Sequence, residues 1–183
     1  MENEEVYVGT NFSLKNRIGR VLWAFVSLLF FKYSPKPFYK WRAFLLRCFG
    51  AKVGKSAHVY PGAKIWAPWN LILADEAAVA SGATLYTQGK IVIGKKAVVS
   101  QGAYLCAGTH DYNLPDFPLI TKPVYIGDYA WIAAEAFIHP GVTIGKGCVI
   151  GARSVVTRDM PDWMVCAGNP CKPLKQRELI LKS

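Results

Sequence analysis

The sequence predicts an all-β solenoid: a parallel β-helix of about five coils, preceded by a helical extension, interrupted by one protruding loop and ended by a short helix. The main evidence is a six-residue repeat, clearest between residues 126 and 156. Every sixth position there is a branched aliphatic: Ile126, Ile132, Ile138, Ile144, Ile150 and Val156. A period of six fits neither a 3.6-residue helix nor an isolated hairpin. It is the signature of a parallel β-helix.

The same spacing extends upstream in three triplets, which are Val53–Val59–Ile65, Leu73–Val79–Leu85 and Ile93–Val99–Leu105. Each hexapeptide supplies one short strand and one corner, and three hexapeptides make a triangular coil of about 18 residues. Successive coils stack about 4.8 Å apart, with each aliphatic on its equivalents above and below. Small residues four positions after most aliphatics fit the tight corners. With triplets beginning at 53, 73, 93, 126 and 144, about five coils are expected.

Three longer steps interrupt the repeat. The steps from Ile65 to Leu73 and from Leu85 to Ile93 are eight residues, which predicts two enlarged corners. The step from Leu105 to Ile126 is 21 residues, so residues 106–125 must leave the solenoid as a loop. Long loops on rigid scaffolds commonly carry function.

The ends of a solenoid need caps. In residues 1–52, Ser13 can cap a helix that runs to about Phe31, and a second helix is expected from Phe38 to Cys48, ending at Gly50. The solenoid itself covers residues 53–158. Residues 159–183 are expected to cross the last coil as an extended segment and to finish as a short helix.

The charge is concentrated near the N-terminus. The formal net charge is +10, and the stretch from Ser13 to Lys52 holds nine Lys or Arg and no Asp or Glu. Such a block suggests attraction to phospholipid or another polyanion, and an ordinary solvated face is an equal alternative. The most apolar run, from Val21 to Phe31, is too short to span a bilayer.

Five cysteines, an odd number without CxxC spacing, suggest neither a disulfide framework nor a zinc site. Reduced thiols favour a cytoplasmic protein, and the acidic N-terminus does not look like a secretory signal. We therefore expect a cytoplasmic location. The basic N-terminal stretch adds the prediction of peripheral contact with the inner face of the membrane. A nucleic-acid partner is not expected.

The repeat region, from about Val53 to Lys175, resembles the hexapeptide-repeat acyltransferases. The string "IGDYAWIAAEAFIHPGVTIGKGCVIGARSVVTRDMPDWMVCAGNPCKPLK" is similar to the C-terminal half of the galactoside and maltose acetyltransferases. "SQGAYLCAGTHDYNLPDFPLITKPVYIG", with the earlier "PWNLIL", is closer to the colanic acid biosynthesis acetyltransferases, which are associated with exopolysaccharide assembly. The resemblance implies a left-handed coil and a homotrimer. It also implies an acetyl-CoA site between neighbouring subunits and O-acetylation of a saccharide, which the N-terminal segment suggests is lipid-linked.

The resemblance makes His110 the candidate general base. A sugar hydroxyl is too weakly acidic to attack a thioester unaided, and imidazole can accept its proton near neutral pH. No serine or cysteine nucleophile is needed for direct transfer. Asp111 and Tyr112 are candidates for acceptor binding, with a turn role as the alternative for Asp111. His58 and His139 are expected to be structural or surface residues.

The family pattern also implies a coenzyme site. Trp131 matches an aromatic that packs on the pantetheine arm, and the backbone amides of Ala134 and Ala152 match groups that reach that arm. The resemblance also assigns four cations to the CoA phosphates, which are Arg153, Arg158, Lys172 and Lys175. The hydroxyl of Thr157 is a candidate for a hydrogen bond near the adenine end. The sequence departs from the galactoside enzymes at Ala80, where they carry an acceptor-binding asparagine, so their sugar specificity does not transfer.

Two other functions fit the same fold. A zinc lyase of the γ-carbonic-anhydrase kind needs three converging histidines, and His58, His110 and His139 are too widely spaced for that pattern, so no metal is expected. A non-catalytic binding solenoid would not need the histidine loop or the basic tail.

Overall fold

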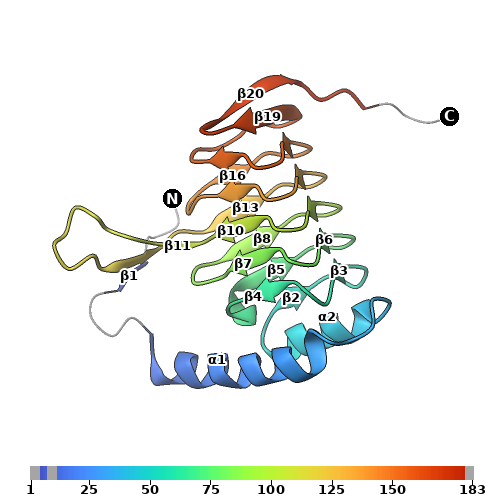
Figure 1. The fold of residues 1–183 in the computed structure, drawn as a ribbon, viewed down its shortest axis with the longest axis vertical. Coiled ribbons are helices and arrows are strands. Elements are labelled where there is room, and N and C mark those ends of the chain that lie inside the picture. The colour runs from blue at the N-terminus through green and yellow to red at the C-terminus, as the bar shows by residue number, and fades with distance from the viewer. Residues whose placement is uncertain (1–4, 8–11, 180–183) are drawn as a thin grey trace.

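The computed structural model describes residues 5–7 and 12–179 and shows a triangular solenoid standing on two helices (Figure 1). Three parallel sheets form its sides. Sheet 1 contains β2 (Lys52–Val53), β5 (Leu71–Leu73), β8 (Ile91–Ile93), β13 (Val124–Ile126) and β16 (Thr143–Ile144). Sheet 2 contains β3 (His58–Val59), β6 (Ala78–Val79), β9 (Val98–Val99), β14 (Trp131–Ile132), β17 (Val149–Ile150) and β19 (Met164–Gly168). Sheet 3 contains β4 (Lys64–Ile65), β7 (Thr84–Tyr86), β10 (Tyr104–Cys106), β15 (Phe137–Ile138) and β18 (Val155–Val156).

The predicted aliphatics form the three inner columns of the solenoid. Strand pairing aligns Ile93 with Ile126 in sheet 1, Val99 with Ile132 in sheet 2, and Leu105 with Ile138 in sheet 3, and the remaining members follow the same register. All of them except Val53, which is partly exposed, are buried. The prediction of a solenoid is confirmed: sheets 1 and 3 have five strands each, and Met160 with β19 adds part of a sixth turn. The left hand stays a prediction.

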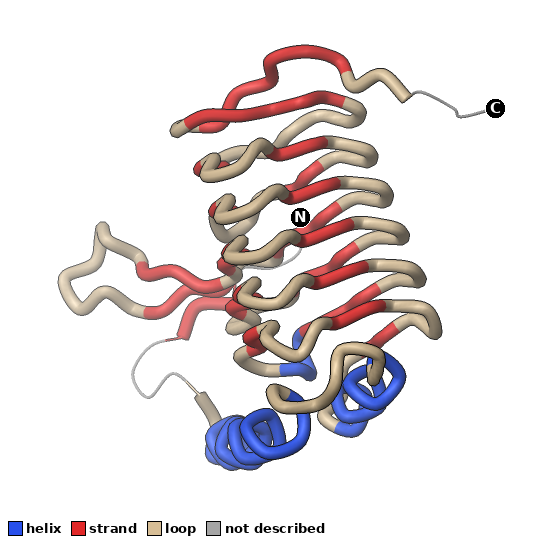
Figure 2. Tube along the Cα trace, turned by 45° about the vertical axis from the view of Figure 1, so that its right-hand side comes forward, coloured by secondary structure: helices blue, strands red, loops and turns tan. Residues whose placement is uncertain are grey.

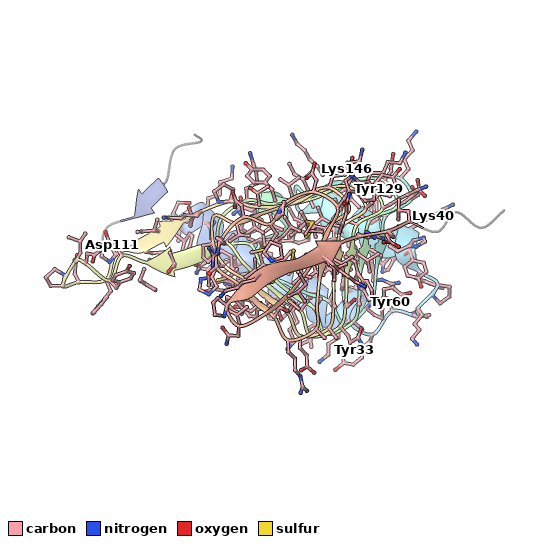
Figure 3. All side chains as sticks on the ribbon, turned by 90° about the horizontal axis from the view of Figure 1, so that it is seen from above. Tyr33, Lys40, Tyr60, Asp111, Tyr129 and Lys146 are labelled. Carbon is pink, nitrogen blue, oxygen red and sulfur yellow. The ribbon has the colours of Figure 1, made fainter. Side chains whose placement is uncertain are left out.

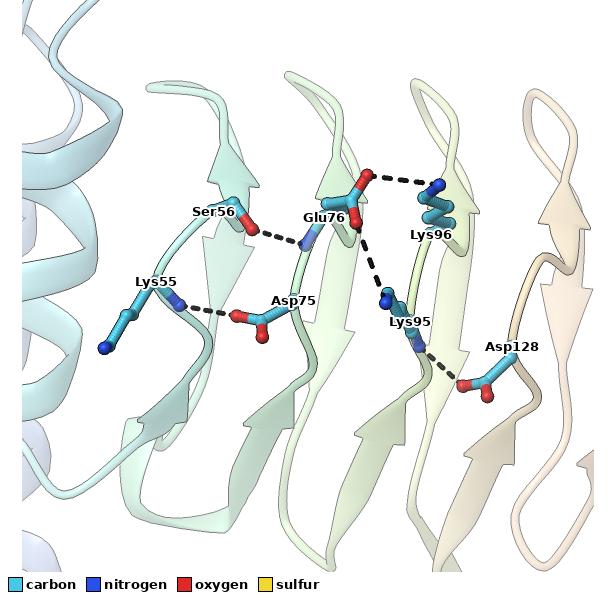
Figure 4. A network of polar contacts seen from close by, with 7 residues as sticks. All are labelled: Lys55, Ser56, Asp75, Glu76, Lys95, Lys96 and Asp128. Carbon is cyan, nitrogen blue, oxygen red and sulfur yellow. Dashed lines mark hydrogen bonds and ion pairs between the residues drawn. The ribbon is translucent and has the colours of Figure 1, made fainter.

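The corners are held by polar bonds between successive coils (Figure 4). At the corner between sheets 1 and 2, Asp75 accepts a hydrogen bond from the backbone N–H of Lys55 at 2.7 Å, and Asp128 accepts one from Lys95 at 2.6 Å. Glu76, in the left-handed region at φ 61°, pairs with two lysines of the next coil. Such exposed ion pairs contribute little, so the carboxylate-to-backbone bonds matter more.

Both enlarged corners lie between sheets 3 and 1, as predicted. The first contains a short 3-10 helix, η2 (Pro68–Asn70). The second contains the buried hydroxyl of Thr87, which receives a hydrogen bond from the Ala67 N–H at 2.7 Å and donates one to the Ala67 carbonyl at 2.9 Å. The two enlarged corners therefore brace each other across neighbouring coils.

The N-terminal helices close the lower end of the solenoid. α1 (Leu14–Val26) is capped by Ser13, whose Oγ accepts from the Asn16 N–H, and it continues as a π-helical turn, η1 (Ser27–Phe31). α2 (Tyr39–Cys48) follows a short turn. Both helices were predicted at these places. Trp23 is buried against the first coil and its indole N–H donates to the Ile65 carbonyl at 2.7 Å.

Arg42 of α2 belongs neither to a solvated face nor to a surface for an anionic partner, because its side chain is fully buried. Its guanidinium donates to the carbonyls of Val59 (2.6 Å), Pro35 (2.8 Å) and Lys36 (2.5 Å), and to the Ser34 hydroxyl (2.8 Å). Burial lowers the pKa of Arg42. This side chain joins α2, the turn before it and the first coil.

The expected C-terminal helix is wrong. Cys171–Gln176 forms β20, which pairs antiparallel with β19 (Figure 1), residues 177–179 are not helical, and residues 180–183 lie outside the described part. The edge of β19 offers unpaired backbone groups that β20 satisfies, and Pro173 within the segment is unfavourable in a helix interior. The segment from residue 159 to β19 does not cross the last coil as expected: Met160 pairs parallel with Ile144, and a turn at residues 162–163 leads into β19, so the segment continues the solenoid as part of a sixth turn.

Candidate active site and coenzyme groove

The long loop is a β-hairpin that leaves the corner between sheets 3 and 1 (Figure 2). Its strands β11 (Gly108–His110) and β12 (Leu119–Thr121) pair antiparallel, with His110 opposite Leu119. β1 (Glu5–Tyr7) adds a third strand along β12. Local sequence pattern does not predict β1, because this pairing joins segments more than 100 residues apart.

His110 is exposed at the end of β11, and its ring is held by the hairpin itself. Its Nδ1 lies 2.6 Å from the carbonyl oxygen of Phe117. A carbonyl can only accept, so Nδ1 carries the proton and Nε2 of the neutral ring has a free lone pair. Phe117 adopts a left-handed backbone, φ 45°, that turns its carbonyl back toward the histidine. The arrangement leaves Nε2 able to accept a proton from a bound hydroxyl.

Asp111 and Tyr112 occupy the turn that follows. The Asp111 carboxylate accepts a hydrogen bond from the Asn113 N–H at 3.0 Å, and its own N–H donates to the Pro118 carbonyl. This is the turn role that the sequence left open, although the second carboxylate oxygen can still meet a ligand. Tyr112 is 81% exposed, with its ring toward solvent.

Cys106, just before the hairpin, is not a nucleophile in this arrangement. Its Sγ lies 3.1 Å from the Gly108 carbonyl, and burial raises the pKa of its thiol. The neutral thiol therefore predominates at physiological pH, which agrees with a transfer that needs no covalent enzyme intermediate.

Trp131 lies on the outer side of sheet 2, where it is 46% exposed, and its indole N–H donates to the Ser100 hydroxyl at 2.9 Å. It lines a groove of about 430 Å³ together with Lys96, Tyr129 and Arg177. Arg177 donates to the carbonyls of Tyr129 and Gly147, and so ties the C-terminal segment to this groove. Sequence reasoning missed Lys96, Ser100 and Arg177, because only the fold places them beside Trp131.

Ala134 and Ala152 occupy equivalent places in successive coils, at the corner between sheets 2 and 3. The Arg153 N–H donates to the Ala134 carbonyl at 2.9 Å, which sets the two coils in register. Neither the N–H of Ala134 nor that of Ala152 has an acceptor within the described residues. These amides are free to bind a ligand, as the resemblance implies.

The candidate phosphate-binding side chains are all exposed. Arg153 already pairs with Glu135, with its Nε 2.6 Å from a carboxylate oxygen, and this hydrogen bond raises the pKa of Arg153. Thr157 and Arg158 follow β18, at the corner between sheets 3 and 1. The hairpin leaves the solenoid at this same corner, two coils lower. Lys172 and Lys175 lie on β20 at the top of the solenoid.

One chain does not bring all these residues together. Figure 3, which views the solenoid from above, shows Asp111 on the hairpin at one corner, Tyr129 and Lys146 at a second, and Tyr60 toward a third. Ala134 and Ala152 share the corner of Tyr60 and lie one side of the triangle from His110. A side of about six residues spans roughly 20 Å. The histidine and the free amides are thus well separated within one protomer.

The three histidines do not converge. The His58 ring packs on Tyr39 at 4.5 Å, the His139 ring on Phe137 at 5.2 Å, and His110 lies on the hairpin. Within residues 5–7 and 12–179, no group of three His, Cys, Asp or Glu is placed to hold a metal ion. The zinc-lyase alternative therefore has no ligand set in the described part of one chain.

The comparisons with known proteins agree with this architecture. The model of the bacterial transferase hexapeptide (six repeats) matches residues 123–158. A protein of Escherichia coli K12, named as a colanic acid biosynthesis acetyltransferase, WcaF, is 46% identical over 162 residues, which are 88% of this chain and 89% of that protein.

Two solved structures share the fold. A maltose O-acetyltransferase from Clostridium difficile 630 is 28% identical, with a TM-score of 0.76 over 91% of this chain and 90% of its own. A hexapeptide-repeat acetyltransferase of Vibrio cholerae O1 biovar eltor, complexed with acetyl coenzyme A, is 24% identical, with a TM-score of 0.80 over 91% of each chain. With its repeat, its histidine hairpin and its WcaF-like sequence, the chain belongs to the hexapeptide-repeat acetyltransferase family and is an acyltransferase.

Proposed function

We propose that the protein transfers an acetyl group from acetyl-CoA to a hydroxyl of a saccharide, with His110 as the general base. The observation that carries this proposal is the bond from Nδ1 of His110 to the Phe117 carbonyl, which leaves Nε2 as a proton acceptor on an exposed hairpin. A general base must lie within hydrogen-bond reach of the proton that it removes, and an exposed Nε2 permits that approach.

In this mechanism Nε2 removes the hydroxyl proton as the sugar oxygen bonds to the acetyl carbonyl carbon. The carbon–sulfur bond of the thioester breaks, and the proton on Nε2 passes to the departing CoA sulfur. The products are an O-acetyl ester and free CoA, and His110 returns to its starting state. The Phe117 carbonyl stabilises the imidazolium between the two proton transfers because it keeps its hydrogen bond to Nδ1.

We further propose that the active unit is a homotrimer. The hairpin carrying His110 and the corner carrying Ala134 and Ala152 lie a triangle side apart in one chain, whereas the reacting atoms must come within about 3–3.5 Å. A neighbouring chain can place its hairpin beside that corner. Trp131, Lys172 and Lys175 then belong to the coenzyme side, and Asp111 and Tyr112 to the acceptor side.

The acceptor that best fits the 46% identity to WcaF is a building block of a surface polysaccharide, free or linked to a lipid. Acetylation of such a unit before export would take place in the cytoplasm, with the enzyme in peripheral contact with the membrane. Within the described residues, none of the helices combines the length and apolar character needed to cross a bilayer.

The test is an assay of CoA release from acetyl-CoA with saccharides, nucleotide sugars and polyprenyl-linked saccharides as acceptors. We expect one saccharide class to release CoA in proportion to ester formed, and sedimentation to show a trimer. CoA release that depends on an amine rather than a hydroxyl acceptor would overturn the proposal of O-acetylation. A monomer that keeps full activity would overturn the shared site.

A further inference from the structure

The lower end of the solenoid exposes an unusually large set of apolar side chains. On α1 and η1 they are Leu14, Ile18, Val21, Leu22, Phe25, Leu28 and Leu29, and on or beside α2 they are Phe38, Trp41 and Phe44. Each is between 39% and 72% exposed. We call this surface the base. Scattered exposed apolar residues are ordinary, but a continuous apolar surface of this kind marks an interaction site.

The base is not the side of α1 that holds the fold together. Trp23 and Phe31 are buried against the solenoid from the opposite side of the helix, and Gly19 lies against the Trp69 ring. The exposed residues recur at three- and four-residue steps and so form a second, outward stripe. Because the inner stripe already buries the helix, the outer stripe has no partner within the described residues.

The charge around the base identifies the partner. Lys15, Arg17, Lys32 and Lys40 are exposed beside the apolar stripe, and the stretch from Ser13 to Lys52 contains no acidic residue. A second protein surface would need acids at matching positions, and a second copy of this base would repel the first. An anionic phospholipid surface satisfies both the apolar stripe and the cations.

A groove beside the base suits a lipid phosphate. It lies between α1 and the first coil, has a volume of about 770 Å³, and is lined by Arg17, Arg20, Lys32 and Lys64 without any acid. The Arg20 guanidinium lies 4.5 Å from the Trp66 ring, which holds it at the groove wall. Four cations around an apolar floor are chemically suited to a phosphate that carries a hydrocarbon chain.

The geometry of the helices fits in-plane docking. α1 lies across the end of the stack rather than along it, as Figures 1 and 2 show. An amphipathic helix in this orientation lies in the headgroup layer with its apolar side toward the acyl chains. The solenoid then stands on the bilayer, and the hairpin leaves the third coil, roughly 10 Å above the first.

A column of rings connects the groove with that coil. Trp66, Tyr86 and Tyr104 follow one another along sheet 3, with an edge-to-face contact at 5.9 Å and a tilted contact at 6.0 Å between centroids. β10, which carries Tyr104, leads into the hairpin. Aromatic rings offer apolar faces against which the C–H faces of sugar rings can pack. A saccharide whose lipid phosphate occupies the groove would therefore extend toward His110.

We propose that the base is a docking face for an anionic phospholipid bilayer, and that the groove between α1 and the first coil receives a lipid phosphate. Docking itself follows from the apolar stripe and the cations. Only the alignment of a lipid-linked acceptor toward His110 rests on the proposed function.

The test is sedimentation of the full chain with vesicles of phosphatidylcholine alone and of phosphatidylcholine mixed with phosphatidylglycerol. We expect binding to the mixed vesicles that weakens as salt rises, because surface charges are screened over about 8–10 Å at physiological ionic strength. Replacing Arg17 and Lys32 with Gln should weaken partitioning by roughly 20–30-fold, since each surface cation contributes about fivefold. Leu22→Gln with Phe25→Gln should abolish most of the remaining salt-resistant binding.

Two matched controls separate the base from general charge and apolarity. Lys90→Gln with Lys146→Gln removes the same charge away from the base, and Leu174→Gln with Leu179→Gln removes exposed leucines at the opposite end. Both controls should bind vesicles as the wild type does. Free inorganic phosphate should compete only weakly, whereas short-chain phosphatidylglycerol should compete well.

The outcomes are distinct. A wild-type protein that fails to sediment with mixed vesicles at low salt overturns the docking proposal. The proposal is also overturned if the control variants lose as much vesicle binding as the variants of the base. Loss of the native oligomer in Leu22→Gln with Phe25→Gln would identify the base as a subunit contact instead. Acetyl transfer to a soluble saccharide should persist in all four variants. Its absence from the wild type would count against the proposed function and leave the vesicle result unchanged.

Discussion

Replacement of His110 separates its hydrogen bond within the hairpin from its proposed role as general base. The ring donates a hydrogen bond from Nδ1 to the Phe117 carbonyl, and it offers Nε2 to an acceptor. His110→Ala removes both functions. His110→Asn keeps an amide N–H near the position of Nδ1 but has no base, so it isolates proton transfer from support of the hairpin.

The size of each effect follows from the surroundings of the ring. His110 is exposed and touches none of the inner columns, so loss of its single hydrogen bond should cost at most about 1 kcal/mol of folding stability. Loss of a positioned general base should reduce acetyl transfer by roughly 10²–10⁴-fold. Affinity for acetyl-CoA should persist.

The assay compares kcat/KM for the true acceptor, the dissociation constant for CoA and the thermal midpoint for both variants. A matched control, His139→Ala, changes a histidine that packs on Phe137, away from the hairpin, and should be almost silent. If His110→Asn keeps most of the activity that His110→Ala loses, His110 supports the hairpin and is not the base. If both variants stay active, the mechanism is wrong.

Three further predictions concern the coenzyme and the stability of the fold. Replacing Lys172 and Lys175 with Ala should raise the KM for acetyl-CoA more than the KM for the sugar, and an unchanged acetyl-CoA KM would remove them from the site. Arg42→Met should lower the free energy of unfolding by about 3 kcal/mol, measured by urea denaturation, because it leaves buried carbonyls without donors. Burial raises the pKa of the Cys148 and Cys166 thiols, so the folded protein retains their protons above the unfolded thiol pKa of about 8.5. The contribution of these two protonated thiols to stability is therefore complete below about pH 8.5 and is lost as the pH rises further. The thermal midpoint should accordingly fall less at alkaline pH in the double variant Cys148→Ala with Cys166→Ala than in the wild type.

The inner columns could be predicted residue by residue because the period of the sequence is the period of the structure. Each coil places its aliphatic on the one below, so a spacing of six translates directly into contacts such as Ile132 on Val99. The two steps of eight residues likewise predicted the enlarged corners. Nothing beyond local pattern was needed, since every contact in a stack of coils repeats the previous one.

The parts that pattern could not predict depend on distant partners. β1 joins the hairpin because β12 leaves an open strand edge. β20 is a strand because β19 also leaves an open edge, although the sequence of the last residues favoured a helix. The burial of Arg42 depends on carbonyls from two separate segments, the turn at Pro35 and Lys36 and the first-coil strand that ends at Val59. His110 and Trp131 were identified by resemblance, whereas Arg177 carries no motif and reaches its groove only in the folded chain.

The corner between sheets 3 and 1 tolerates changes that the strands cannot. One residue inserted into a strand would turn every later aliphatic of that coil outward, and the error would pass to each coil above. The hairpin instead adds its residues at a single corner and returns the chain in register, with Val124–Ile126 paired to Ile91–Ile93. Since loop-closure entropy grows only slowly with length, this corner can accept longer, shorter or foreign hairpins. In the proposed mechanism, acceptor choice therefore resides in a replaceable module, and an exchange of residues 107–122 between relatives should transfer specificity without redesign of the solenoid.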